Sequence, residues 1–116
     1  MGFDRELIAA STTPIILSIL ERRRNEGGVH SYGYSIIKEV ASLSQENMQW
    51  TEGMLYPVLH RLERNGFLRS HWGRSESGRR RKYYGITESG IAELQRLKSQ
   101  WETVDSILRS NWNEKN

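Results

Sequence analysis

Residues Gly53–Thr87 read GMLYPVLHRLERNGFLRSHWGRSESGRRRKYYGIT, and three patterns follow one another in this stretch. Apolar residues recur at helical spacing as far as Asn65, and Gly66 ends the pattern. Two short segments rich in aromatic and β-branched residues come next, on either side of a turn made of glycine, arginine, serine and glutamate. A helix followed directly by a basic β-hairpin is the order of elements in a winged helix, so the stretch predicts a module that contacts double-stranded DNA.

The basic residues of the chain are concentrated in the same stretch. Residues 51–82 contain eight Arg or Lys and three acids, whereas the rest of the chain contains nine basic and eleven acidic residues. Almost all of the eight are arginines, whose planar guanidinium suits phosphates and guanine edges. They are Arg61, Arg64, Arg69, Arg74, Arg79, Arg80, Arg81 and Lys82. A basic surface that is merely solvated would scatter lysines widely, so this concentration predicts a phosphate-binding face.

Length and composition exclude several classes of protein. A chain of 116 residues suffices for one domain with a modest core, and a second subunit would help it to bury apolar surface. No segment approaches the roughly 18 apolar residues of a membrane span, and Asp4, Arg5 and Glu6 do not fit a signal peptide. We therefore expect a cytoplasmic protein with no membrane partner. Because the chain has no cysteine, no metal-ligand spacing of histidines and no acid–base constellation, we expect no cofactor, no metal and no enzyme activity.

Apolar residues predict a first helix whose second half is buried nearly all round. The pattern ends at Arg22–Arg24, before Gly27, and basic residues favour the carboxyl end of a helix. Pro14 interrupts this helix. Because proline costs about 3 kcal/mol inside a helix, either Thr12 or Thr13 caps a new helix or a single helix is kinked there.

Two further helices are predicted between the first helix and the hairpin. Ser31–Leu43 has apolar residues at helical spacing, and a polar loop follows it. Thr51 supplies a cap for a third helix that runs to Asn65 and stops at Gly66, with a local bend expected at Pro57. Its predicted core stripe is Leu55, Val58 or Leu59, and Leu62. Two helices of which the second has a basic outer face form a helix-turn-helix, whose second helix enters the major groove.

The hairpin is predicted from two strands, Phe67–Trp72 and Lys82–Ile86, that flank a loose turn. Residues Arg79–Lys82 would project from the turn and the second strand, where they can reach phosphates or the minor groove. The alternative is an edge hairpin that charges protect against aggregation. That alternative explains one or two cations but poorly explains four in a row.

A long final helix is predicted from Thr87 onward. Between Leu94 and Leu108 apolar residues recur with spacings of 3, 4, 3 and 4, which is a seam of two heptads. We expect this seam to pack in a helical bundle against the first helix of a second subunit and against the same seam of that subunit. The predicted organisation is a winged-helix DNA-binding domain over residues 1–87, which includes the first helix, and a dimerisation helix over residues 88–116.

The predicted fold class is therefore mostly α with a small β-hairpin: a winged helix-turn-helix plus a long carboxyl-terminal dimerisation helix. The predicted partners are double-stranded DNA and a second copy of the chain. The candidate DNA-binding residues are Tyr34, Ser35, Lys38, Thr51, Gly53, Tyr56, Pro57, His60, Arg61, Arg79, Arg80, Arg81 and Lys82. For Tyr34 and Tyr56, a place in the packing of the domain is an open alternative.

Three segments of the chain have the order and spacing of a known set of motifs. They are SYGY at Ser31–Tyr34, GMLYPVLHRLE at Gly53–Glu63 and RKYYGITESG at Arg81–Gly90. Together they resemble the PadR family of bacterial transcriptional regulators, and the resemblance covers about residues 7–112. It implies a dimeric repressor that binds an inverted-repeat operator.

The chain is also similar to the short, multidrug-responsive members of that family. In those proteins one tryptophan from each subunit stacks on planar drugs at the centre of the dimer. The resemblance implies a site here for a small planar aromatic ligand, made by Ile15, Ile19, Trp101 and Asp105. Asp105 would supply the countercharge to a cationic compound, and ligand binding would release the DNA. For Trp101 the alternative is a place in the core of the subunit interface.

The sequence also allows a second function, different from that of a DNA-binding regulator. It is a winged-helix protein-interaction adaptor without ligand sensing, since a fold does not define its function. An adaptor that binds only proteins would have no reason to keep a strongly cationic hairpin. The charge pattern therefore favours the regulator.

Overall fold

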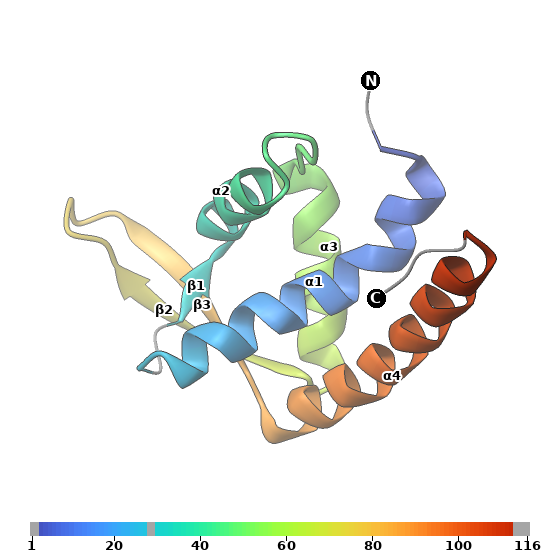
Figure 1. Cartoon of the computed structure of the whole chain (residues 1–116). Helices are drawn as coiled ribbons and strands as arrows, with labels where there is room; N and C mark the ends of the chain where they lie inside the picture. The colour runs from blue at the N-terminus through green and yellow to red at the C-terminus, as the bar shows by residue number, and fades with distance from the viewer. Residues whose placement is uncertain (1–2, 28–29, 113–116) are drawn as a thin grey trace.

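Four helices and a three-stranded antiparallel sheet form the chain in this computed structural model, which describes residues 3–27 and 30–112 (Figure 1). The elements are α1 (Arg5–Asn25), β1 (Ser31–Tyr32), α2 (Gly33–Leu43), α3 (Glu52–Arg64), β2 (Leu68–Arg74), β3 (Arg80–Ile86) and α4 (Glu88–Asn111). The hairpin of β2 and β3 extends away from the helices on one side, and α4 runs beside α1 on the other (Figure 1). The predicted class, a winged helix-turn-helix with a long last helix, is confirmed.

The sheet has the strand order β1-β3-β2, so β3 is its central strand. β2 pairs with β3 along its whole length, whereas β1 pairs only through Ser31 and Tyr32, opposite Tyr84 and Tyr83. The expectation that a helix begins at Ser31 is wrong, because α2 begins at Gly33. The cause lies outside the local sequence: the two preceding residues are held by β3, and a strand of two residues is too short to show an alternating pattern.

Helix α1 is continuous through Pro14, so the interpretation of a new helix capped by Thr12 or Thr13 is wrong. The axis of α1 changes direction in its amino-terminal half (Figure 1). Proline removes one backbone donor there, and the Thr12 hydroxyl donates to the Ile8 carbonyl at 2.6 Å, which is a contact that bends helices. The single kinked helix, the other interpretation of the sequence, is what forms.

Helix α3 has the bounds that its caps predict. The Thr51 hydroxyl accepts a hydrogen bond from the Met54 amide at 3.2 Å, and Gly66 leaves the helix with a φ of +82°. Leu59 is fully buried, so it completes the predicted core stripe in place of Val58, which is only partly buried. The buried stripe fixes which face of α3 is turned outward.

One cluster of buried hydrophobic residues joins the helices to the hairpin. Its members are Ile16, Leu17, Ile19, Leu20, Ile36, Val40, Trp50, Leu55, Leu59, Leu62, Leu68, Tyr84, Ile86 and Leu94. Burial of an aliphatic side chain of this size contributes about 1.5–3 kcal/mol, so this cluster is the main source of stability. From α4 the cluster takes only Leu94, and the second half of that helix lies outside it. No helix of the described ranges is long and apolar enough to cross a membrane.

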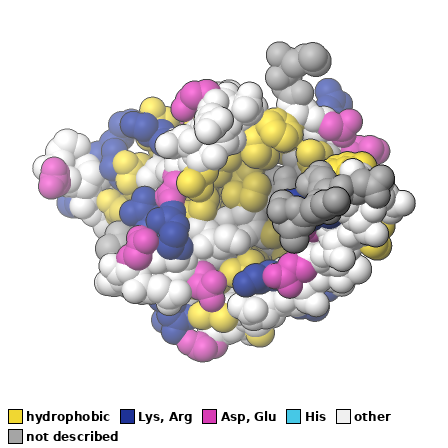
Figure 2. All heavy atoms as spheres, in the orientation of Figure 1, with side chains coloured by type: hydrophobic (Ala, Val, Ile, Leu, Met, Phe, Trp, Pro, Cys, Tyr) yellow, Lys and Arg dark blue, Asp and Glu magenta, His cyan; other side chains and the backbone are white. Residues whose placement is uncertain are grey.

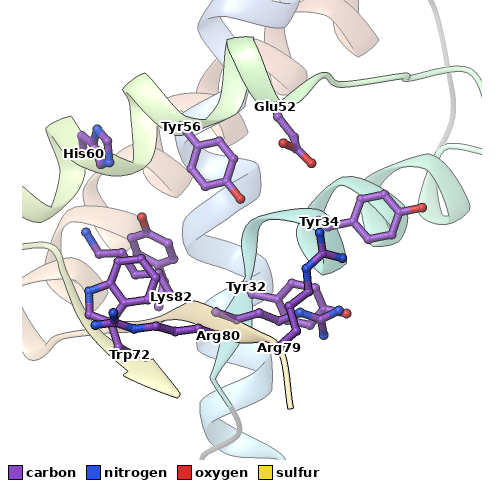
Figure 3. Close-up of a pocket in the computed structure, with 11 residues that line it drawn as sticks. Tyr32, Tyr34, Glu52, Tyr56, His60, Trp72, Arg79, Arg80 and Lys82 are labelled. Atoms are coloured by element: carbon purple, nitrogen blue, oxygen red, sulfur yellow. The ribbon is translucent and has the colours of Figure 1, made fainter. Parts of the chain in front are cut away.

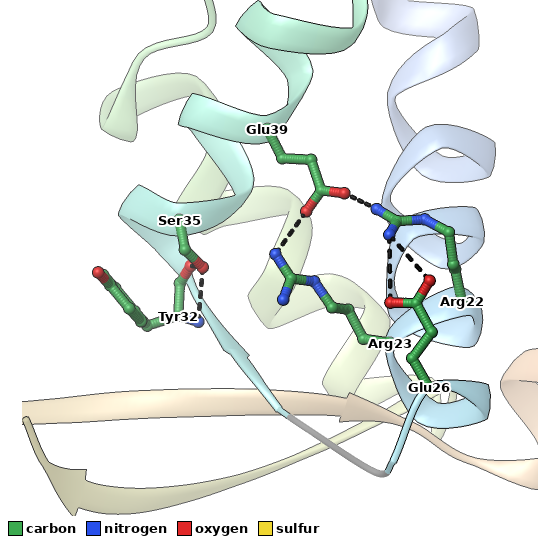
Figure 4. Close-up of polar contacts among 6 residues, drawn as sticks. All are labelled: Arg22, Arg23, Glu26, Tyr32, Ser35 and Glu39. Atoms are coloured by element: carbon green, nitrogen blue, oxygen red, sulfur yellow. Dashed lines mark hydrogen bonds and ion pairs between the residues drawn. The ribbon is translucent and has the colours of Figure 1, made fainter.

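Glu39 of α2 forms ion pairs with two arginines at the end of α1 (Figure 4). Its carboxylate pairs with Arg22 Nη2 and, at 3.0 Å, with Arg23 Nη2, while its own side chain is only 14% exposed. Arg22 also lies 3.4 Å from Glu26, one turn further along α1. The cationic end of α1 therefore does more than complement the helix dipole, because it also holds α2 in place.

We expect Glu39→Gln to lower the free energy of unfolding by about 1–2 kcal/mol, because it removes the negative partner of two arginines in a partly buried cluster. Glu26→Gln is the matched control: it removes an exposed pair one helical turn apart and should cost no more than about 0.5 kcal/mol. Urea unfolding measures both losses. Equal losses in the two variants would contradict the role assigned to Glu39.

Candidate nucleic-acid interface

The outer face of α3 is exposed from its first turn onward. Gly53, Pro57 and His60 follow one another along it at helical spacing, and all three are exposed. Tyr56 lies beside them and is half-buried, because its ring packs on Gly33 of α2. A Cβ atom at Gly33 would lie 2.5 Å from the Tyr56 hydroxyl oxygen, so any larger residue at position 33 would displace the Tyr56 ring.

A groove of about 620 Å³ lies between α3 and the hairpin (Figure 3). In this view α3 contributes its side chains from above, and the hairpin contributes its cations from below. The lining residues are Tyr32, Tyr34, Glu52, Tyr56, His60, Trp72, Arg79, Arg80, Arg81, Lys82 and Tyr84. Four of them are Arg or Lys and one is an acid, so the groove attracts anions.

The turn of the hairpin is compact and places one cation at its end. Gly78 has a φ of +85°, and the Ser75 amide donates to the Arg79 carbonyl at 2.9 Å. Both strands reach further toward the turn than predicted, to Arg74 and Arg80. Of the four consecutive cations, Arg79 therefore lies in the turn and the other three lie on β3.

Both arginines of β3 lie close over aromatic rings. The guanidinium carbon of Arg80 is 4.5 Å from the centroid of the Trp72 ring, and that of Arg81 is 4.1 Å from the centroid of Tyr32. Both distances are within the range in which the face of an aromatic ring attracts a cation. Each arginine of β3 thus has its own aromatic neighbour.

Lys82 differs from these arginines because it is paired with an acid of α3. Its Nζ atom lies 3.5 Å from Glu63 Oε1, and the Ser70 hydroxyl donates to Glu63 Oε2 at 2.5 Å. The hydrogen bond from Ser70, followed by the charge of Lys82, holds the pKa of Glu63 below its usual range. Glu63 therefore stays ionised, compensates much of the Lys82 charge and joins α3 to both strands of the hairpin.

Comparison with known proteins accounts for this combination of elements. The sequence model of the transcriptional regulator PadR-like family matches residues 16–96, which include α3 and the whole hairpin. The chain belongs to this PadR-like family. The resemblance read from the three sequence motifs is thereby confirmed at the level of the family.

Three relatives of this PadR-like regulator show how far the similarity extends. A solved transcriptional regulator of Clostridium thermocellum is 33% identical, with a TM-score of 0.76 over 90% of this chain and 96% of that one. An uncharacterized protein of Lysinibacillus sphaericus is 35% identical over 104 residues, which are 89% of each chain. The transcriptional regulator YqjI of Escherichia coli is 29% identical over 96 residues, which are 83% of this chain but 42% of YqjI.

The fold of the PadR-like regulator brings seven of the predicted DNA-binding residues to the groove. They are Tyr34, Tyr56, His60, Arg79, Arg80, Arg81 and Lys82. Thr51, Gly53 and Pro57 lie on the exposed face of α3 beside the groove. The two alternatives for Tyr56 are both realised in part, because it packs on α2 and also lines the groove.

Two other predicted residues are hydrogen-bonded within the chain. The Ser35 hydroxyl donates to the Tyr32 carbonyl at 2.7 Å and so closes the first turn of α2. Arg61 Nη2 donates to Thr13 Oγ1 at 3.2 Å, which turns Arg61 toward α1 and away from the groove. Spacing along a helix predicted the exposed face correctly but could not predict where a long side chain turns.

Tyr34 and Lys38 share the exposed face of α2. Tyr34 is 51% exposed, so it is not held in the core, and the Lys38 Nζ atom lies 5.6 Å from the centroid of its ring. The groove is also lined by four residues that were not among the predicted DNA-binding residues: Tyr32, Glu52, Trp72 and Tyr84. The available signal for Trp72 was a tryptophan in the strand on the other side of the turn from the cationic run.

A second hollow of about 560 Å³ lies between α1 and α4, and it includes Ile15, Ile19 and Trp101. Figure 2 shows hydrophobic side chains near the hollowed middle of this face of the PadR-like regulator. Asp105 does not line the hollow, since its carboxylate is 2.9 Å from Arg109 Nε on the same helix. Three of the four residues assigned to a ligand by resemblance are thus neighbours of one apolar space.

His30 and His71 meet at the base of the hairpin, with their Nδ1 atoms 3.3 Å apart. In the described ranges no three His, Cys, Asp or Glu side chains could together hold a metal ion, so the pair is not part of a larger cluster there. Burial, and then the charges of His71 and Arg69, lower the pKa of His30 from its ordinary value of 6.5. The unfolded chain therefore binds this proton at higher pH than the folded protein does, and acidification through about pH 6.5 favours unfolding.

We expect the melting temperature to fall as the pH is lowered from 7.5 to 5.5, and to fall less in a His71→Gln variant. The variant removes one of the charges that lower the pKa of His30, so less stability is lost on acidification. His60→Gln removes an exposed histidine of α3 and should behave like the parent. Thermal melts at several pH values measure the three dependences, and identical slopes would show that His30 does not respond to His71.

Proposed function

We propose that this PadR-like regulator binds double-stranded DNA as a homodimer, with α3 in the major groove and the hairpin on the flanking backbone. The observation that carries the proposal is that the hairpin cations and the exposed face of α3 border the same groove. The amino-terminal end of α3, with its partial positive charge, adds to the attraction for phosphates. In this arrangement Gly53, Pro57 and His60 would face base edges, and Arg79, Arg80 and Arg81 would contact phosphates.

The exposed apolar residues in the second half of α4 are the evidence for the proposed homodimer. Val104, Ile107, Leu108 and Trp112 are 40–61% exposed, and they recur along the helix at a spacing that forms an apolar row. A second copy of the chain would remove this row from water by packing on it about a twofold axis. The two copies of α3 could then enter successive major grooves about 34 Å apart, which corresponds to an inverted-repeat operator. We propose that the regulator acts there as a repressor, in the cytoplasm.

The hairpin cations provide the direct test of the proposed function. We expect a variant with Arg80→Ala and Arg81→Ala to bind all DNA sequences more weakly, because backbone contacts carry no sequence information. The slope of log affinity against log salt concentration should become shallower by up to about 3.6, since a dimer would lose four cations at about 0.9 each. Fluorescence anisotropy of labelled genomic fragments between about 50 and 200 mM salt measures both quantities.

Arg96→Ala is the matched control for the loss of positive charge. Arg96 lies on α4 and is paired with Glu93 at 2.7 Å, away from the groove, so its loss should leave the salt slope unchanged. Parent-like binding by the double variant would remove the hairpin from the interface. If the parent itself shows no salt-dependent binding to DNA, the adaptor function is favoured instead.

We further propose that the hollow between α1 and α4 binds planar aromatic cations, as in the LmrR-type, multidrug-responsive members of the family. Ile15 and Ile19 give it an apolar wall, and Trp101 offers a half-buried ring for stacking. The hollow lies beside the exposed apolar row of α4, so the second subunit would complete it. Asp105, one turn beyond Trp101, would supply the countercharge, and occupancy would alter the dimer and release DNA.

Tryptophan fluorescence tests the ligand proposal. We expect a planar cationic dye to quench the emission of the parent, and Trp101→Ala to weaken dye binding by about tenfold or more, because the stacking platform is lost. Trp72→Ala is the control, since Trp72 lies on the hairpin, does not line the hollow and is not part of the apolar row of α4, so its removal should leave the dye affinity unchanged. Quenching that persists unchanged in the Trp101 variant would leave Trp101 with a structural role alone.

A further inference from the structure

Consecutive arginines of β3 belong to opposite faces of the sheet, because side chains alternate along a strand. The register of the sheet places Trp72 of β2 on the face of Arg80, and Tyr32 of β1 on the face of Arg81. Each aromatic residue comes from a different neighbouring strand. The two arginines therefore have independent aromatic contacts, and the side chains of both reach the groove beside α3.

These contacts hold the arginines without neutralising them. The Arg80 guanidinium carbon lies 4.5 Å from the centroid of Trp72, and the Arg81 carbon lies 4.1 Å from that of Tyr32. Within the described ranges neither guanidinium is ion-paired with a carboxylate, whereas Lys82 is paired with Glu63. The positive charges of the two arginines are therefore left for a partner, while the positions of their side chains are restricted.

The geometry of a guanidinium explains why an aromatic support suits a phosphate-binding arginine. The five N–H donors lie in the plane of the group, so stacking one face on a ring leaves the donors at the edge free. A long arginine side chain that is already held loses less freedom when it binds than one that is mobile. Trp72 is 58% exposed, so burial of its ring in the core does not account for it.

We propose that Trp72 is a positioning residue for DNA binding, whose ring holds the Arg80 guanidinium in place for the backbone of the duplex. The inference rests on the proposed function, because it assigns a role within the same interface. Tyr32 stands in the same relation to Arg81, but its ring also packs on Tyr83 with centroids 5.7 Å apart. Trp72 is the better target for a test, since its loss leaves that aromatic packing intact.

A double-mutant cycle separates positioning of Arg80 from every other role of Trp72. The four proteins are the parent, Trp72→Ala, Arg80→Ala and the double variant, each titrated on the same DNA fragment. We expect Trp72→Ala to weaken binding about five- to thirtyfold for a dimer with two hairpins. In the Arg80→Ala background the same change should have no further effect, because no guanidinium is left to hold.

The salt dependence distinguishes the two single variants. Trp72→Ala removes no charge and should keep the salt slope of the parent, whereas Arg80→Ala should reduce it by about 1.8 for two subunits. Arg80→Lys changes the other partner of the contact without changing its charge. Because lysine lacks the planar guanidinium, this variant should bind DNA more weakly but keep the salt slope of the parent. A parent-like affinity of Trp72→Ala, or a loss that persists in full without Arg80, would overturn the proposal.

The mobility of the side chain gives a readout that does not depend on DNA. In the free protein the ¹⁵N order parameter of Arg80 Nε should fall on Trp72→Ala, while that of Arg79 in the turn should stay unchanged. An Arg80 side chain as mobile in the parent as in the variant would overturn the proposal even if DNA binding is observed. An ordered Arg80 in a parent that shows no salt-dependent DNA binding would instead overturn the proposed function, and the positioning role with it.

Discussion

Tyr84 and Ile86 are buried in the core at the base of β3, and the same strand leaves the core toward the turn of the hairpin. This burial fixes the register of the central strand against both β1 and β2, since a slip by one residue would turn both side chains out of the core. The same slip in register would exchange the faces of Arg80 and Arg81 and separate each arginine from its aromatic neighbour. The position of every cation of the hairpin thus depends on apolar packing at the far end of the strand.

The elements that could be predicted from the sequence are those with strong local signals. Helix α3 was predicted to within one residue of its bounds because Thr51 and Gly66 mark its ends and leucines mark its inner face. Strand β1 was not predicted, because its residues are extended only through pairing with β3, which lies far along the chain. At Pro14 the local sequence allowed two outcomes, and the packing of a single α1 against the core decides between them.

The site could be predicted as a region but not as a set of contacts. The concentration of arginines drew attention to the hairpin, and most of the expected residues gather at one groove. The turn of Arg61 toward α1 and the pairing of Lys82 with Glu63 depend on neighbours that are distant in sequence. The contact between Arg80 and Trp72 depends on the hairpin register, which the residue composition of the turn does not define.

The contacts of Glu63 affect how well α3 and the hairpin could adjust to the shape of a DNA duplex. Because its carboxylate contacts Ser70 of β2 and Lys82 of β3, Glu63 connects α3 to both strands of the hairpin. These contacts oppose a change in the angle between the helix and the hairpin, so under the proposed function part of the adjustment to a duplex of another shape would fall on the nucleic acid. Sequences whose grooves widen or narrow at low elastic cost would then be preferred even at base pairs that no side chain reaches.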